Sequence, residues 1–84
     1  MKTNPKRPSA IDRHVGAGIR SLRKARRLTQ AKLAQKLGLT TQQVQKYESG
    51  ASRVSASRLY DIAQVFGVRV GHFFHSLIEP TDDA

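Results

Sequence analysis

The 84-residue chain lacks cysteine and tryptophan altogether, and its apolar residues never run on for long. Without cysteine it can form neither a disulfide nor a thiolate metal site. No apolar run approaches the roughly 20 residues of a membrane-spanning helix, and no signal-peptide-like stretch follows the basic start. We therefore expect a cytoplasmic protein. A domain of about 60 residues buries only about 60% of its unfolded surface, so association with a second copy is the expected additional source of stability.

Acidic side chains are also scarce. The formal net charge is +9, from 15 Lys and Arg against six Asp and Glu. Nine of the basic residues lie within residues 1–28, where Asp12 is the single acid. Such an excess of positive charge predicts an anionic partner, most often a nucleic acid. The competing interpretation is a charged face that is merely solvated.

The usual patterns of a catalytic or metal site are missing too. The three histidines, His14, His72 and His75, have no acid or cysteine at metal-ligand spacing. Nothing places a Ser, a His and an Asp as a catalytic triad, and there is no Gly-rich phosphate loop. We therefore expect no enzymatic activity, no metal and no cofactor. No small-molecule ligand is expected either, because no part of the chain remains for a ligand-sensing domain.

What the sequence does contain is a helical periodicity. Apolar residues recur every three or four positions in five segments, and no segment alternates as a strand would. The predicted fold class is therefore all-α, with five short helices in one domain over residues 11–78. Residues 1–10 are predicted to form a disordered basic arm, and residues 79–84 a disordered acidic tail.

Capping residues predict where the middle helices begin and end. The expected N-caps and terminal glycines are, in pairs, Thr29 and Gly38, Thr40 and Gly50, and Ser55 and Gly67. Thr40 and Gln43 together predict a capping box at the start of a helix over residues 41–49. In the first helix, Gly16 and Gly18 each cost about 1 kcal/mol relative to alanine, which suggests that another backbone packs closely there.

The helix over residues 41–49 has two different faces. Successive residues turn by about 100° around a helix, so Val44, Tyr47 and Glu48 face inward while Gln42 and Lys46 point away. The outer face carries amides and an ammonium group but no acid, unlike an ordinary solvated face with Glu–Lys pairs. A side-chain amide can match the N6 and N7 edge of adenine, and a lysine can reach guanine or a phosphate. This chemistry favours a DNA-reading helix.

The same region carries a family resemblance. Residues 29–50, TQAKLAQKLGLTTQQVQKYESG, resemble the helix-turn-helix of the phage repressor and Cro class, the XRE family. The matching positions are Gln30, Leu33, Ala34, Leu37, Gly38, Val44, Tyr47, Glu48 and Gly50. The chain also resembles short stand-alone proteobacterial regulators of this class. The resemblance implies a five-helix bundle of the lambda-repressor-like DNA-binding type, with the helix over residues 41–49 in the major groove.

The resemblance also implies roles for individual residues. Gln30 would hold a phosphate together with the N-terminal amides of the second helix. Gln42 is the first candidate for a base contact, and Arg53 is the main candidate for a backbone contact in the following loop. The full set of DNA-binding residues implied in this way is Gln30, Thr40, Thr41, Gln42, Gln43, Lys46 and Arg53.

Glu48 faces inward, where an unpaired carboxylate would be costly. In the resembling family an arginine of the first helix pairs with this glutamate, and Arg23 occupies that position. The resemblance therefore implies a structural ion pair between Arg23 and Glu48, which would hold the recognition helix against the first helix.

The last helix is the expected dimer interface. The adjacent Phe73 and Phe74 lie about 100° apart, so we expect one to enter the core and the other to be available to a second subunit. The expected interface residues are Val70, Phe73, Phe74, Leu77 and Ile78.

The expected function is a dimeric, sequence-specific regulator that binds double-stranded DNA and represses transcription by occluding promoters. Two alternatives stay open. One is an antitoxin-like protein-interaction module, and the other is a sequence-indifferent architectural DNA-binding protein that uses the basic arm.

Overall fold

The computed structural model describes residues 9–77, and the side chains of residues 9–75. These residues form four α-helices and a final 3-10 helix: α1 Ala10–Ala25, α2 Gln30–Leu37, α3 Thr41–Ser49, α4 Ala56–Phe66 and η1 Val70–Leu77. The predicted all-α class is confirmed, and the predicted fifth helix is a 3-10 helix. Within the described part, no helix has the length and apolarity that a membrane crossing requires.

The predicted disordered arm and tail lie almost wholly outside the described residues. Of residues 1–10, the structure describes only the last two: Ser9 is the N-cap of α1, and Ala10 is its first residue. Ser9 caps α1: its hydroxyl accepts a hydrogen bond from the Asp12 amide at 3.0 Å, and the Asp12 carboxylate accepts one from the Ser9 amide at 3.4 Å. This reciprocal capping box starts α1 one residue before the predicted boundary. Ile78 and the tail over residues 79–84 lie outside the described residues.

The other helix ends are set by the predicted local signals. Thr29, Thr40 and Ser55 are the N-caps of α2, α3 and α4, and each side-chain hydroxyl accepts a backbone amide three residues on. Of the two hydrogen bonds in the predicted capping box of Thr40 and Gln43, the structure contains the one that the Thr40 hydroxyl accepts from the Gln43 amide. The three helices end at glycines with left-handed backbones: Gly38, Gly50 and Gly67 have φ values of 69°, 82° and 69°.

The end of α1 differs from the others in one respect. Arg27 has a positive φ of 58° and is the only residue other than glycine with a positive φ among those described. Its amide bonds to the carbonyl of Lys24, and the next amide, of Leu28, bonds to the carbonyl of Arg23. The same pair of bonds closes α2 around Gly38 and α4 around Gly67. Arg27 therefore occupies a position that glycine fills elsewhere, at a typical cost of about 1–2 kcal/mol.

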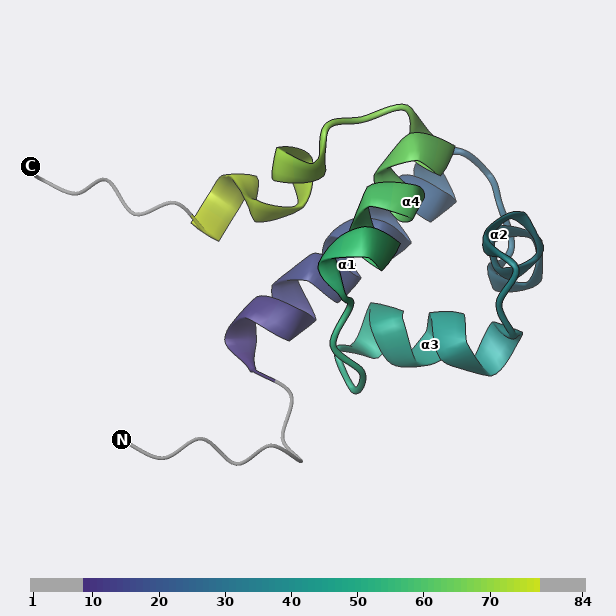
Figure 1. Cartoon of the computed structure of the whole chain (residues 1–84), viewed down its shortest axis with the longest axis horizontal. Helices are drawn as coiled ribbons and strands as arrows, with labels where there is room; N and C mark the ends of the chain where they lie inside the picture. The colour runs from purple at the N-terminus through teal and green to yellow at the C-terminus, as the bar shows by residue number, and fades with distance from the viewer. Residues whose placement is uncertain (1–8, 78–84) are drawn as a thin grey trace, which may run out of the picture.

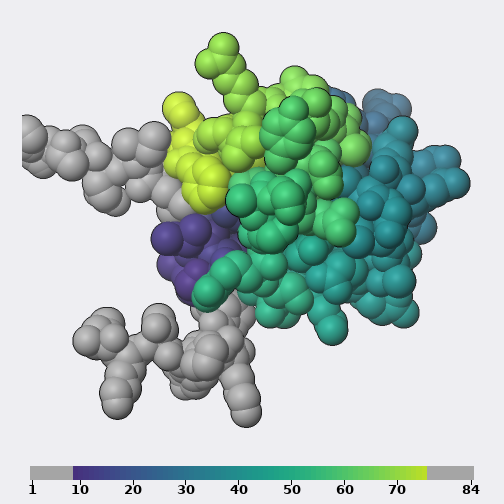
Figure 2. Space-filling view, in the orientation of Figure 1, coloured from purple at the N-terminus to yellow at the C-terminus, as the bar shows by residue number. Residues whose placement is uncertain are grey.

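All five helices enclose one core. The largest fully buried side chains come one from each helix: Ile19, Leu33, Val44, Ile62 and Phe73. α3 packs against both α1 and α2, and η1 packs against α1 (Figure 1). In the space-filling view, η1 and the start of α1 lie at the end of the molecule opposite α2 (Figure 2). Ile11, in the first turn of α1, is an apolar residue outside this core and is 54% exposed.

At Gly16 the backbones of α1 and α3 lie in close contact. A Cβ atom at this position would overlap the carbonyl oxygen of Tyr47 and lie 2.7 Å from that of Glu48. The backbone of α3 therefore passes directly over Gly16, as the sequence suggested. At Gly18 a Cβ would meet only a side-chain atom, Cδ1 of Phe73, at 3.3 Å. The close backbone approach predicted for both glycines exists only at the first.

Candidate nucleic-acid interface

α3 has a buried face and an exposed face, as its sequence predicts. Val44, Tyr47 and Glu48 are 1%, 8% and 8% exposed. The opposite side consists of Gln42, Gln45, Lys46 and Ser49, all exposed, with Thr41 and Gln43 half-buried at its edges. Within the described part of the chain, the side chains of Gln42, Gln45 and Lys46 have no hydrogen-bond partner. The two amides and the ammonium group of this face are therefore available to a ligand, whereas the Ser49 hydroxyl donates to the carbonyl of Lys46 at 3.2 Å and accepts from the amide of Ala51 at 3.3 Å.

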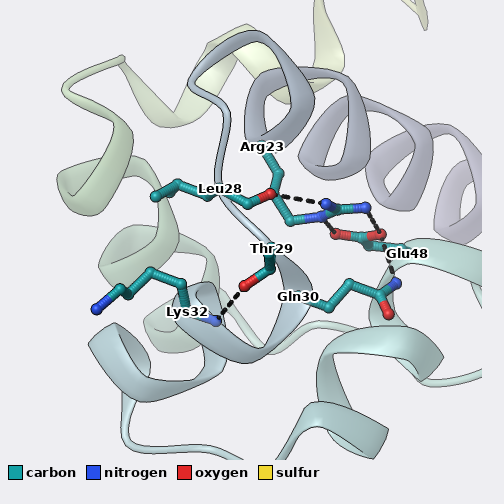
Figure 3. Close-up of polar contacts among 6 residues, drawn as sticks. All are labelled: Arg23, Leu28, Thr29, Gln30, Lys32 and Glu48. Carbon is teal, nitrogen blue, oxygen red and sulfur yellow. Dashed lines mark hydrogen bonds and ion pairs between the residues drawn. The ribbon is translucent and has the colours of Figure 1, made fainter.

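The buried face is held by an ion pair (Figure 3). Nε of Arg23 donates to Oε2 of Glu48 at 2.6 Å, and Nη2 donates to Oε1 at 3.1 Å. The third guanidinium nitrogen, Nη1, donates to the carbonyl of Leu28 at 2.8 Å. Arg23 and Glu48 are each 8% exposed, and the two parallel hydrogen bonds between them fix the relative orientation of their side chains. This network ties the end of α3 to α1 and to the turn that leads into α2.

Gln30 has a partner that the sequence did not reveal. Its Nε2 donates to Oε1 of Glu48 at 3.0 Å, so the Glu48 carboxylate receives three hydrogen bonds from the described residues (Figure 3). A primary amide has two N–H groups and an acceptor oxygen, so Gln30 keeps one donor and its carbonyl oxygen for another contact. The phosphate contact expected of Gln30 stays a prediction. Its structural role is to lock the first residue of α2 onto α3.

Arg53 lies in the loop after α3 and faces solvent. Its side chain is 71% exposed, and its Nε lies 3.2 Å from Oδ2 of Asp12. Burial raises the pKa of the Asp12 carboxyl, but hydrogen bonds from Ser9 and Arg53 outweigh burial and hold the pKa below its usual 3.8. Because Asp12 engages Nε alone, the two terminal nitrogens of Arg53 remain exposed. This arrangement leaves the guanidinium able to contact a phosphate.

Part of the positive charge serves the fold instead of a ligand. Nη2 of Arg26 donates to the carbonyl of Phe66 at 2.6 Å, and Nη1 of Arg58 donates to the carbonyl of Leu37 at 3.4 Å. Both acceptors are the last residues of helices, whose final carbonyls lack intrahelical partners. No pattern in the sequence indicates these contacts, because the two members of each pair are 40 and 21 residues apart. The net positive charge predicted an anionic partner, but Arg26 and Arg58 make contacts within the fold, as the resemblance already implied for Arg23.

The expected dimer-interface residues separate into different environments. Phe73 is only 1% exposed, so its assignment to a dimer interface is wrong: its ring fills the core between η1 and α1. Val70 and Phe74 are half-buried. Phe74 lines a groove whose apolar walls also include Ile11, Val54 and Leu59. The side chains of Leu77 and Ile78 lie outside the described part.

Comparison with known proteins agrees with this geometry. A family model described as helix-turn-helix matches residues 19–73. An uncharacterised HTH-type transcriptional regulator of Sinorhizobium medicae is 50% identical over 74 residues, which are 88% of this chain and 53% of that protein. An uncharacterised transcriptional regulator in the ATPase CF(0) region of Rhodospirillum rubrum is 49% identical over 67 residues, 80% of this chain and 62% of that protein. The chain thus spans little more than half the length of these curated relatives.

A solved structure shares the fold. The restriction-modification controller protein C.AhdI from Aeromonas hydrophila superimposes with a TM-score of 0.74 at 29% identity, over 79% of this chain and all of that one. The family match runs from within α1 into the first half of η1 and includes α2, its glycine turn and α3. The chain therefore belongs to the helix-turn-helix family of the XRE type.

Proposed function

We propose that the chain is a sequence-specific regulator of transcription that binds double-stranded DNA and reads the major groove with α3. The observation that carries the proposal is the outer face of α3, where exposed amides and a lysine have no partners among the described side chains. An amide pairs with the N6 and N7 edge of adenine, and a lysine with O6 or N7 of guanine. A face meant only for water would more typically carry acids paired with bases.

Within this face, Gln42 is the residue assigned to a base contact. It is exposed and lies in the first turn of α3, the part of a recognition helix that contacts base edges. Lys46 lies one turn further along the same side and can reach a base or a phosphate. Thr41 and Gln43, both half-buried, would contact DNA at the edges of the interface.

The remaining contacts would position the protein on the DNA backbone. Thr40 already accepts the amide of Gln43 at 3.1 Å, but its hydroxyl hydrogen is free to donate to a phosphate. Gln30 would use its second N–H together with the first amides of α2. Arg53, held by Asp12 through Nε, would present its terminal nitrogens. The buried pair of Arg23 and Glu48 would act indirectly, by fixing the angle of α3.

The regulator is proposed to act as a dimeric repressor in the cytoplasm. A dimer formed through η1, with Val70 and Phe74 at the interface, would place two copies of α3 about 34 Å apart, as successive major grooves on one side of DNA require. Occlusion of a promoter by such a dimer needs no further domain. This arrangement accounts for the half-buried Phe74 and for the marginal core of a small domain.

The proposal is tested by selecting bound duplexes from a random pool and measuring affinity for the selected and the random sequence. We expect a preference of about 10³-fold or more for the selected duplex. Six to ten phosphate contacts would lower affinity by roughly 10³ to 10⁵ between 50 and 200 mM salt. Equal affinity for both duplexes would contradict specific reading and favour an architectural role. Sedimentation with and without the duplex checks the dimer, which a monomer under both conditions would contradict.

A further inference from the structure

Arg27 has a backbone conformation that its residue type disfavours. The turn after α1 has the same two backbone hydrogen bonds as the turns after α2 and α4, and both of those have glycine at the left-handed position. Glycine adopts this conformation without steric cost, whereas a side chain brings Cβ close to the next carbonyl. A residue kept in such a conformation is a reason to look for a role of its side chain.

The neighbouring arginines are already occupied, and Arg27 is not. Arg23 is bound to Glu48 and to the carbonyl of Leu28, and Arg26 is bound to the carbonyl of Phe66. Arg27 itself is exposed. Within residues 9–75 its side chain has no hydrogen-bond or ion-pair partner. The contacts inside the fold therefore give no reason for an arginine at this position.

The location of the turn suggests what the side chain could contact. Two residues after Arg27 the chain reaches Thr29, the N-cap of α2, and then Gln30, which is bonded to Glu48 of α3. The carbonyl of Leu28 is held by Arg23, so the turn is fixed beside the end of α3 (Figure 3). Arg27 thus precedes the first amides of α2, which the proposed function places at a phosphate. A guanidinium is well suited to a phosphate next to such amides.

We propose that Arg27 is a DNA-phosphate contact, held in a left-handed turn so that its guanidinium lies next to the N-terminus of α2. This inference rests on the proposed function, since it assigns an additional residue to the same DNA interface. The rigid turn would limit the conformations of the side chain and place it beside the backbone before DNA arrives. Its contribution would be equal for all sequences, because a phosphate carries no sequence information.

The test compares Arg27→Gly with the parent in two measurements. Glycine relieves the backbone, so the melting temperature should rise, by about 2–6 °C. Affinity for the selected duplex and for a random duplex should fall alike, by roughly five- to tenfold at 0.1 M salt, and the salt slope should decrease by about one. Arg27→Lys keeps the positive charge and keeps a side chain at the position with the left-handed backbone. This variant should therefore melt like the parent and retain most of the affinity.

Arg69→Gln is the matched control for net charge. Arg69 is an exposed arginine in the connection before η1 and is not among the residues proposed to contact DNA. Its loss should therefore change affinity for DNA by less than about twofold. Arg27→Gly binding as the parent does, with an unchanged salt slope, would overturn the inference and leave the proposed function intact. A lower melting temperature for Arg27→Gly would also overturn it, because the arginine would then serve the dipole of α1. Loss of affinity in Arg27→Lys equal to that in Arg27→Gly would overturn the role of charge. A parent that binds neither duplex would instead refute the proposed function.

Discussion

The two faces of α3 differ in how many partners their polar groups have. On the inner face, the carboxylate of Glu48 receives three hydrogen bonds, two from Arg23 and one from Gln30. On the outer face, Gln42, Gln45 and Lys46 have none from the described side chains. A helix only nine residues long thus combines a saturated side with an unsaturated one. The saturated side determines where α3 lies, and the unsaturated side is left for what α3 binds.

The largest effect should come from a change that pushes the inner face away from α1. In Gly16→Ala the new methyl group would overlap the carbonyl of Tyr47, and backbone atoms cannot yield as the end of a side chain can. We expect a loss of about 5 kcal/mol or more, enough to unfold a domain at the lower end of ordinary stabilities. Urea denaturation measures it.

Gly18→Ala is the control for this change. It adds the same methyl group to the same helix, but the methyl meets only the ring of Phe73 at 3.3 Å. Its stability should stay within about 1 kcal/mol of the parent, because alanine also favours the helix. Equal effects at both glycines would mean that α1 and α3 do not pack backbone to backbone.

The next largest effect should follow from removing the acceptor on the inner face. Glu48→Ala leaves the guanidinium of Arg23 buried without its carboxylate, which typically costs about 3–5 kcal/mol in the free energy of unfolding. Asp61→Ala is the comparison, since Asp61 forms an exposed pair with Arg58 at 3.8 Å and should cost at most about 1 kcal/mol. A Glu48 variant as stable as the Asp61 variant would contradict a structural role for the buried pair.

Changes on the outer face should affect binding and leave folding unchanged. Gln42→Ala should lower affinity for the selected duplex by about 1–3 kcal/mol and hardly change affinity for random DNA, because Gln42 carries no charge. Gln45→Ala is the control, because this exposed glutamine of the same helix lies about 100° around the axis from Val44, on the flank of the outer face, whereas Gln42 points almost directly away. The measured quantity is the ratio of the two affinities. If the Gln42 variant keeps the ratio of the parent, Gln42 does not read a base.

The sequence predicted the helices well because their ends are local. A capping hydroxyl and the amide that it caps are three residues apart, and a terminal glycine needs no distant partner. Thr29, Thr40 and Gly38 therefore mark real boundaries. The sequence predicts the start of α1 one residue too late, because Ser9, its N-cap, lies in the segment whose composition predicts a disordered arm.

The polar partners were harder to predict because they depend on how the helices cross. Only the resemblance suggested the pair of Arg23 and Glu48. Nothing in the spacing indicated that Gln30 would bond to Glu48, or that Arg26 would reach the end of α4. The left-handed backbone of Arg27 could not be predicted either, because an arginine in the sequence does not indicate a positive φ as a glycine after a helix does.

The smallest expected effect belongs to the ion pair of Asp12 and Arg53, in which only Arg53 is exposed to solvent. This pair is the comparison for the fully buried pair of Arg23 and Glu48. Asp12→Asn keeps the shape of the α1 cap but removes the charge. Because the pKa of Asp12 is lowered in the folded protein, its charge stabilises the fold above the ordinary value of 3.8, and this contribution is lost as the pH falls through the folded value. The side chain of Arg53 is 71% exposed, so solvent screens the pair and the contribution at pH 7 should be about 1 kcal/mol or less. The parent should therefore melt about 1–5 °C above the variant at neutral pH, and the two melting temperatures should converge in acid. A difference that persists unchanged in acid would show that the carboxylate charge is not its source.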